Sequence, residues 1–153
     1  MPRTTPTLKS SYPRVMNMPT RWADNDPYGH VNNVAYYSFF DTAVNKNLIE
    51  SNVLDIENSA VIGVVVETHC SFLSPVCFPD ELDVGLKVVK LGEHSVQYEI
   101  GIFRSTQDHA SAVGYFTHVY VDRETRRPAN IPAQVRHVLS TLVCEPAPAT
   151  AQI

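Results

Sequence analysis

The feature that most constrains the fold of this chain is one long helical pattern, residues 33–50. The stretch NVAYYSFFDTAVNKNLIE contains neither glycine nor proline. Apolar side chains recur along it at helical spacing, at Val34, Tyr37, Phe40, Val44 and Leu48. Three more widen this surface beyond what a surface helix needs: Tyr36, Phe39 and Ala43. The pattern predicts a helix wrapped by the rest of the chain and capped at Asn32 and Asn33.

Four stretches of alternating polar and apolar residues follow this helix. They cover residues 60–73, 81–91, 95–103 and 110–121. A period of two predicts strands with one buried face, and the short turn-like connections between them predict antiparallel pairing of consecutive strands. We expect a further strand before the helix, over residues 15–22. Near the end of the chain, Pro132 opens a short amphipathic helix.

The predicted order is a strand, the long helix, a meander of four strands and a small helix. One long helix beside five antiparallel strands predicts an α+β fold in which a curled sheet wraps round the helix. A chain of 153 residues suits a single domain spanning residues 1–153. We expect its core to cover residues 15–142, and the proline-bearing ends, residues 1–13 and 145–153, to be mobile.

Composition excludes several classes of function. Twelve basic against 16 acidic side chains give a net charge of −4, and no basic run marks a nucleic-acid or polybasic membrane surface. The longest apolar stretch, residues 60–66, is far shorter than the roughly 18 residues of a membrane span. The first residues lack the apolar core of a secretory signal. We therefore expect a soluble, cytoplasmic protein with neither nucleic acid nor membrane as a partner.

The three cysteines, Cys70, Cys77 and Cys144, are an odd number without C-x-x-C spacing. This pattern predicts neither a disulfide framework nor a zinc site. His69 and Cys70 are adjacent, but neighbours in a strand point to opposite faces, so Cys70 is expected to be a packed thiol and not a nucleophile.

The densest cluster of polar and titratable residues, RWADNDPYGHVNN, covers residues 21–33 before the helix. A calcium loop starting at Asp24 fails because two of its oxygen-ligand positions hold Tyr28 and Ala35. A transition-metal site of Asp24, Asp26 and His30 would need ligands that the sequence does not locate.

Two interpretations of this loop remain open on physical grounds. In one, Asp26 is a catalytic carboxylate, the free N–H groups of the first helical turn stabilise negative charge on a carbonyl oxygen, and Gly29 lets the backbone approach the ligand. In the other, Asp24 and Asp26 only cap turns and His30 is an ordinary loop histidine.

The segment DPYGHVNN, residues 26–33, followed by Tyr36, Tyr37 and a helix, resembles the motif of hotdog-fold acyl-CoA thioesterases of the 4-hydroxybenzoyl-CoA thioesterase type. Looser similarity extends over most of residues 15–140. The predicted element order agrees with the hotdog fold, a curled five-stranded antiparallel sheet around one central helix with a short C-terminal helix. The resemblance implies hydrolysis of an acyl-CoA thioester to free acid and coenzyme A, without a metal or other cofactor.

The resemblance also implies roles for single residues. Asp26 attacks the thioester or activates water, and Asn33 supplies a backbone N–H to the thioester oxygen. His30 is the third catalytic candidate. Apart from the resemblance, we expect the substrate to be bound by Gly29, Tyr37, Arg104 and Arg126. The resemblance places the site between two subunits, so a homodimer or homotetramer is expected.

An acidic protein that binds coenzyme A must gather positive charge locally. Spacing does not select among the candidates, which are Lys87, Lys90, Arg104, Arg123, Arg126, Arg127 and Arg136. Tyr28, Tyr37 and Phe40 are candidates to shape an acyl pocket, although such aromatics more often pack in a core.

Three alternatives stay open. The catalytic acid is on the helix in a second hotdog branch, which here would make it Asp41 or, less favoured, Glu50. A hotdog enoyl-CoA hydratase would use Asp26 and His30, although its usual spacing is one residue shorter. A non-catalytic acyl-CoA-binding module would keep the fold without turnover. No G-x-S-x-G segment supports a serine hydrolase.

Overall fold

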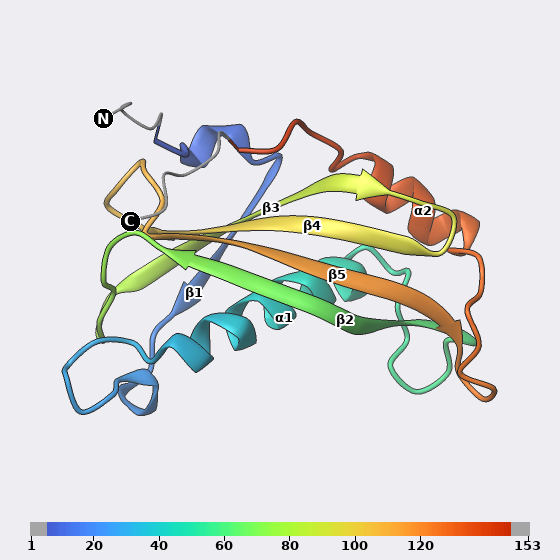
Figure 1. The fold of residues 1–153 in the computed structure, drawn as a ribbon, viewed down its shortest axis with the longest axis horizontal. Helices are drawn as coiled ribbons and strands as arrows, with labels where there is room; N and C mark the ends of the chain where they lie inside the picture. Colours follow the sequence, from blue (N-terminus) through green and yellow to red (C-terminus); the bar gives the residue numbers. More distant parts are fainter. Residues whose placement is uncertain (1–5, 148–153) are drawn as a thin grey trace.

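The computed structural model describes residues 6–147, so the outermost parts of both expected mobile ends, residues 1–5 and 148–153, lie outside the described residues. Figure 1 shows a curled sheet with one long helix lying across its concave face. The elements in chain order are the 3-10 turn η1 (Lys9–Ser11), β1 (Arg14–Pro19), the 3-10 turn η2 (Trp22–Asp24), α1 (Asn33–Glu50), β2 (Val61–Phe72), β3 (Glu81–Leu91), β4 (Ser95–Arg104), β5 (Ala112–Asp122) and α2 (Ala133–Ser140).

The five strands form one antiparallel sheet in the order β1-β3-β4-β5-β2, which confirms the predicted α+β hotdog architecture. The expected meander is wrong in one respect. β2 does not pair with β3, because the connection of residues 73–80 crosses the end of the sheet and leaves β2 at the far edge, beside β5. Within the described part of the chain, β2 therefore pairs on one side only and has a free edge 12 residues long.

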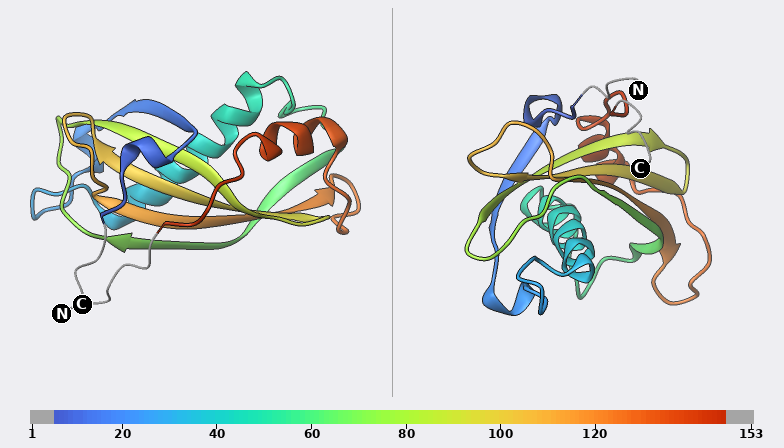
Figure 2. Two further views of the ribbon diagram at one scale, coloured as in Figure 1. Left: turned by 90° about the horizontal axis from the view of Figure 1, so that it is seen from above. Right: turned by 60° about the vertical axis from the view of Figure 1, so that its left-hand side comes forward.

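Helix α1 begins and ends where the sequence predicts, and the Asn32 side chain caps it by accepting a hydrogen bond from the Val34 N–H at 3.0 Å. The Phe40 ring lies against Gly114 of β5, where any Cβ atom would collide with it. The buried face of α1 differs from the predicted one at the start of the helix, where Val34 was expected to be buried and is 67% exposed. Short α2 packs beside the C-terminal end of α1 in the same core (Figure 2).

Two terminal expectations are corrected. The first strand ends at Pro19 and not at residue 22, because the chain turns there into η2. Residues 6–13 and 145–147, expected to be mobile, lie against the convex face of the sheet instead. Tyr12 is buried there against Gly85 and Gly101, whose lack of a Cβ makes room for its ring. Over residues 6–147, no helix has the length and apolar character needed to cross a membrane.

Candidate active site

The loop between β1 and α1 is fixed by backbone hydrogen bonds at both ends. Thr20 N–H donates to the Asp80 carbonyl at 3.2 Å, and Val31 N–H donates to the Val76 carbonyl at 2.7 Å. Asn32 N–H donates to the Asp24 carbonyl at 2.7 Å, which closes the loop on itself. The crossing segment 73–80 therefore holds the start of α1, and a rigid support of this kind is typical of functional loops.

Asp24 has a structural role in this loop. Its buried carboxylate accepts hydrogen bonds from the Arg21 N–H and the Arg21 guanidinium, both at 2.8 Å. Burial alone raises the pKa of Asp24, but these bonds from Arg21 outweigh burial and leave the pKa below its usual value. The carboxylate is thus occupied, and no group of three or more His, Cys, Asp or Glu side chains within the described residues is placed to hold a metal ion.

Asp26 is held differently, with one carboxylate oxygen bound and the other free. Oδ1 accepts hydrogen bonds from the backbone N–H groups of Tyr28 at 2.8 Å and His30 at 3.3 Å. Gly29, at φ 84°, makes the tight turn that brings these donors round. Oδ2 has no hydrogen-bond partner among residues 6–147, so it is available to a water molecule or a carbonyl carbon.

The first turn of α1 supplies a free donor beside this carboxylate. The Val34 N–H is taken by the Asn32 side chain, and the Ala35 N–H donates to the Asn32 carbonyl at 2.9 Å. The Asn33 N–H has no acceptor anywhere in the described part of the chain, and Asn33 itself is exposed. Such an N–H at a helix start can stabilise a developing oxyanion.

Asp26 and Asn33 line the same open groove, of about 360 Å³. His30 lines it with them, so the groove brings together all three predicted catalytic residues. The opposite wall comes from the end of β2 and the crossing segment, with Phe72, Leu73, Ser74 and Pro75.

The predicted substrate-binding residues are dispersed. Gly29 belongs to the Asp26 turn. Tyr37 is half-buried on α1 and packs edge-on against Phe40, 6.0 Å between ring centroids. Arg104 lies beside Asp80, 3.4 Å from Nε to the carboxylate, at the same end of the sheet as the groove without lining it. Arg126 lies beyond the opposite end, past the pairing of Val61 with Asp122, about 30 Å away along the strands.

The structure weakens several alternatives. The half-buried Cys70 thiol has a pKa raised to about 12 by burial, which keeps it protonated. Exposed Asp41 accepts a hydrogen bond from Asn45, and Glu50 is paired with Arg14. Lys87, a candidate for coenzyme A phosphates, is wrong for that role because it is buried in an ion pair with Glu99 at 3.3 Å.

Sequence reasoning did not assign Tyr36, Phe72 and Ser74 to the site, although all three line the groove. Tyr36 is buried, burial raises its pKa to about 12, and its ring meets Phe72 edge-on at 5.0 Å. The available signals were the position of Tyr36 shortly after the DPYGHVNN motif and the looser similarity over residues 15–140, and neither assigned these three residues a role.

Comparison with known proteins bears on this groove. The family model described as the thioesterase-like superfamily matches residues 20–139. Among solved structures, the PA5185 protein of Pseudomonas aeruginosa is 48% identical with a TM-score of 0.89, covering 91% of this chain and 97% of its own. A putative thioesterase from Pseudomonas aeruginosa is 27% identical with a TM-score of 0.76, covering 82% of this chain and 97% of its own.

A 1,4-dihydroxy-2-naphthoyl-CoA thioesterase from Synechocystis shares the fold at 18% identity, with a TM-score of 0.75, over 82% of this chain and 94% of its own. A search among curated proteins found no match. The family match spans the Asp26 loop, the central helix, all of β2 to β5 and most of α2. This chain belongs to the thioesterase-like superfamily and has the hotdog fold.

Proposed function

We propose that this protein is an acyl-CoA thioesterase that hydrolyses a thioester to a free acid and coenzyme A. One observation carries the proposal: the free Oδ2 of Asp26 and the free N–H of Asn33 belong to residues lining one groove. Membership of the thioesterase-like superfamily supports the same reaction class.

In the proposed mechanism the thioester carbonyl oxygen accepts a hydrogen bond from the Asn33 N–H. Asp26 Oδ2 either attacks the carbonyl carbon, giving a mixed anhydride that water then hydrolyses, or removes a proton from the water that attacks. In both routes negative charge develops on the carbonyl oxygen and is stabilised at the helix start, before the coenzyme A thiolate leaves. The Tyr28 and His30 N–H groups hold the carboxylate in position.

We further propose that the working form is a homodimer, or a homotetramer built from such dimers. The free edge of β2 is long and its first half is apolar, with Val65 and Val66 exposed, and an edge of this kind favours pairing with another strand. Phe72 ends this strand, and it lines the groove together with Leu73, which follows it. Pairing two copies along β2 would therefore place the groove at the subunit interface.

Antiparallel pairing of two β2 strands also gives a role to the arginines at the far end of the sheet. The Val61 end of one copy would lie beside the Phe72 end of the other, and Val61 pairs with Asp122, where the turn carrying Arg126 begins. Arg123 is occupied by the Ser59 and Ile56 carbonyls, whereas exposed Arg126 is available to coenzyme A phosphates.

The decisive experiment compares Asp26→Asn with Asp41→Asn, the same substitution at the rival acid on the helix. Release of free thiol is followed over a panel of short, long and aromatic acyl-CoAs. Asp26→Asn should lower kcat by about a hundredfold or more, while substrate binding stays within about threefold, because the carboxylate acts in the chemical step. Asp41→Asn should stay within about threefold of the wild type.

Each other result has a defined meaning. Full activity in Asp26→Asn would sink the mechanism, and loss of activity in Asp41→Asn instead would transfer the role to the helix. Loss of crotonyl-CoA absorbance without thiol release would indicate a hydratase. Tight acyl-CoA binding without turnover on any substrate would indicate a binding module.

The phosphate role is tested with two thioesters of the same acyl group, one on coenzyme A and one on N-acetylcysteamine, which lacks the nucleotide. Arg126→Ala should raise KM about tenfold for the coenzyme A ester only, as one lost charge-assisted contact implies. Arg104→Ala is the matched comparison. A KM increase confined to Arg104→Ala would assign the coenzyme A phosphates to Arg104 and not to Arg126.

A further inference from the structure

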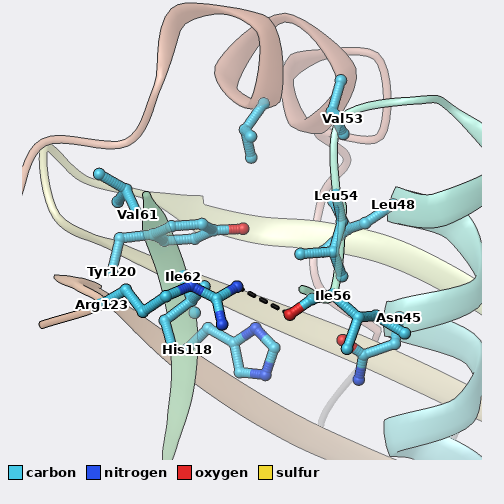
Figure 3. Close-up of a pocket in the computed structure, with 12 residues that line it drawn as sticks. Asn45, Leu48, Val53, Leu54, Ile56, Val61, Ile62, His118, Tyr120 and Arg123 are labelled. Carbon is cyan, nitrogen blue, oxygen red and sulfur yellow. Dashed lines mark hydrogen bonds between the residues drawn. The ribbon is translucent and has the colours of Figure 1, made fainter. Parts of the chain in front are cut away.

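A second cavity, of about 200 Å³, lies at the other end of α1 from the Asp26 groove. It is lined by the C-terminal half of α1, the adjoining ends of β2 and β5, the loop of residues 51–60 and Val135 of α2 (Figure 3). Its lining residue Leu48 is about 22 Å along the helix axis from Asn33. Within one protomer this cavity is therefore separate from the groove.

Two polar side chains point from β5 into this space, His118 and Tyr120, each only 2% exposed (Figure 3). The Nδ1 atom of His118 and the hydroxyl of Tyr120 have no hydrogen-bond partner within residues 6–147. The neighbouring Tyr98 hydroxyl has none either, and its ring meets His118 edge-on at 6.1 Å. Buried polar groups are nearly always paired, so an unpaired His118 Nδ1 beside two hydroxyls that have only each other nearby indicates a site that a further molecule completes.

The cavity offers neutral hydrogen-bonding groups. Burial lowers the pKa of His118 to about 4, against the opposing effect of the Asp41 carboxylate, so the imidazole is neutral at pH 7. Burial raises the pKa of Tyr120 to about 12, against the opposing effect of the nearby Tyr98 hydroxyl, so the Tyr120 hydroxyl keeps its proton. The Arg123 guanidinium at the wall already donates to the Ser59 carbonyl at 2.6 Å and the Ile56 carbonyl at 2.8 Å. A neutral ligand thus fits the site better than an ion.

The remaining lining favours an apolar body of ring size. Leu48, Leu54, Val61 and Val135 form much of the wall. A protein cavity of roughly 150 Å³ is known to hold benzene, so this volume accepts a substituted ring. Ile56 lines the cavity and is 68% exposed, so the cavity wall reaches solvent at this residue.

We propose that this cavity binds a small neutral molecule with a ring-sized apolar body and one hydroxyl group, which pairs with His118 and Tyr120. Gly63 of β2 keeps the polar end open, because a Cβ atom there would lie 2.7 Å from His118 Nδ1. The site does not depend on turnover at Asp26, so its occupancy can be measured directly.

The test compares phenol with toluene, which has a methyl group in place of the hydroxyl, by NMR titration of the full chain. Phenol should shift the amide signals of residues 61–63 and 118–120, and bind at least about tenfold more tightly than toluene, since two hydrogen bonds to neutral groups supply such a ratio. Equal affinity for the two probes would overturn the proposed hydroxyl recognition. No shift of these amides, as expected for a cavity holding only water, would overturn the site.

Two variants test the assigned partners. Tyr120→Phe and His118→Leu should each weaken phenol binding about fivefold and leave toluene binding within about twofold. Tyr115→Phe is the matched control, because Tyr115 lies on the same strand with its side chain on the other face. Unchanged phenol affinity in Tyr120→Phe, a variant that keeps the ring and its packing, would remove the tyrosine from the site even where His118→Leu fails to fold.

Discussion

The sheet buries a polar cluster on each of its faces, and the two differ in how their hydrogen bonds are satisfied. Tyr98 and Glu99 are adjacent in β4 and belong to opposite clusters. The outer cluster, Tyr12, Lys87 and Glu99, lies on the convex face. The inner cluster, Tyr98, His118 and Tyr120, faces α1. The comparison distinguishes buried polar side chains that stabilise the fold from buried polar side chains that are free to bind a ligand.

The outer cluster is paired within the chain. Tyr12 donates to Glu99 at 2.6 Å, Lys87 lies 3.3 Å from the same carboxylate, and the Ala147 N–H donates to its other oxygen at 2.6 Å. The Lys87 ammonium also lies 4.7 Å from the centre of the Tyr12 ring. Segments from both ends of the chain thus close over one carboxylate. In the inner cluster, by contrast, three polar atoms have no well-formed hydrogen bond to any of residues 6–147.

Breaking the outer cluster should have the largest effect on stability. Glu99→Ala leaves the Lys87 ammonium buried without its partner, and removal of one member of a buried pair typically costs about 3–5 kcal/mol of unfolding free energy. Urea denaturation followed by circular dichroism measures the loss. The control is Glu93→Ala at an exposed position, with an expected change within about 0.5 kcal/mol. A similarly small change at Glu99 would contradict the structural role of the outer cluster.

The sequence could predict the helix and strands because their signals are local. Residues 33–50 are helix as predicted, and periodicity located every strand to within a few residues. The outer cluster was not predictable in this way, because Tyr12 and Glu99 are 87 positions apart in the chain and meet only once β1, β3 and β4 pair. Proline-bearing ends suggested mobility, whereas a buried carboxylate holds parts of both in place.

The second-largest expected effect separates the contribution of the Tyr12–Glu99 hydrogen bond from that of the Tyr12 ring. Tyr12→Phe keeps the ring between Gly85 and Gly101 and its contact with the Lys87 ammonium, and removes only the hydroxyl that donates to Glu99. A hydrogen bond to a charged group contributes about 1.5–3 kcal/mol, so the unfolding free energy should fall by that amount. Urea denaturation of Tyr12→Phe and Glu99→Ala under the same conditions shows whether Tyr12→Phe loses less unfolding free energy, as expected. A loss equal to that of Glu99→Ala would mean that Lys87 contributes little.

The candidate site was predictable only where a local motif carried it. Asp26, Gly29, His30 and Asn33 lie within eight residues, so their grouping in one loop and helix start follows from the sequence. The wall formed by Phe72 and Ser74 depends on the crossing segment, which carries the chain from β2 at one edge of the sheet to β3. The sequence predicted instead that β2 and β3 pair as neighbours. The inner cluster joins β4 to β5 across the sheet, and no motif marks it.

The third effect is a pH dependence that belongs to the inner cluster. Burial lowers the pKa of His118 to about 4, below the unfolded value of about 6.5, so the unfolded chain binds more protons between these two values. Stability is therefore lost as pH falls from about 6.5 towards 4, by about 2 kcal/mol between pH 7 and pH 5.

His118→Gln should reduce this acid-induced loss, whereas His94→Gln, at an exposed position, should retain it. Denaturation of the three proteins at pH 7 and pH 5 gives the comparison. Equal pH dependence in all three would show that the folded state accommodates a charged His118.

The smallest expected effect is on the unfolding free energy of an inner-cluster variant, and its sign is opposite to that of the outer-cluster variants. Tyr120→Phe removes a buried hydroxyl without a partner, so the unfolding free energy should stay unchanged or rise by up to about 1 kcal/mol, while the chemically identical change at Tyr12 lowers it. Saturating phenol should then stabilise the wild type more than Tyr120→Phe, because only the wild type pairs both polar groups with the ligand. A loss of stability in Tyr120→Phe as large as in Tyr12→Phe would show that the inner hydroxyl is already paired in solution, and the contrast between the two faces would disappear.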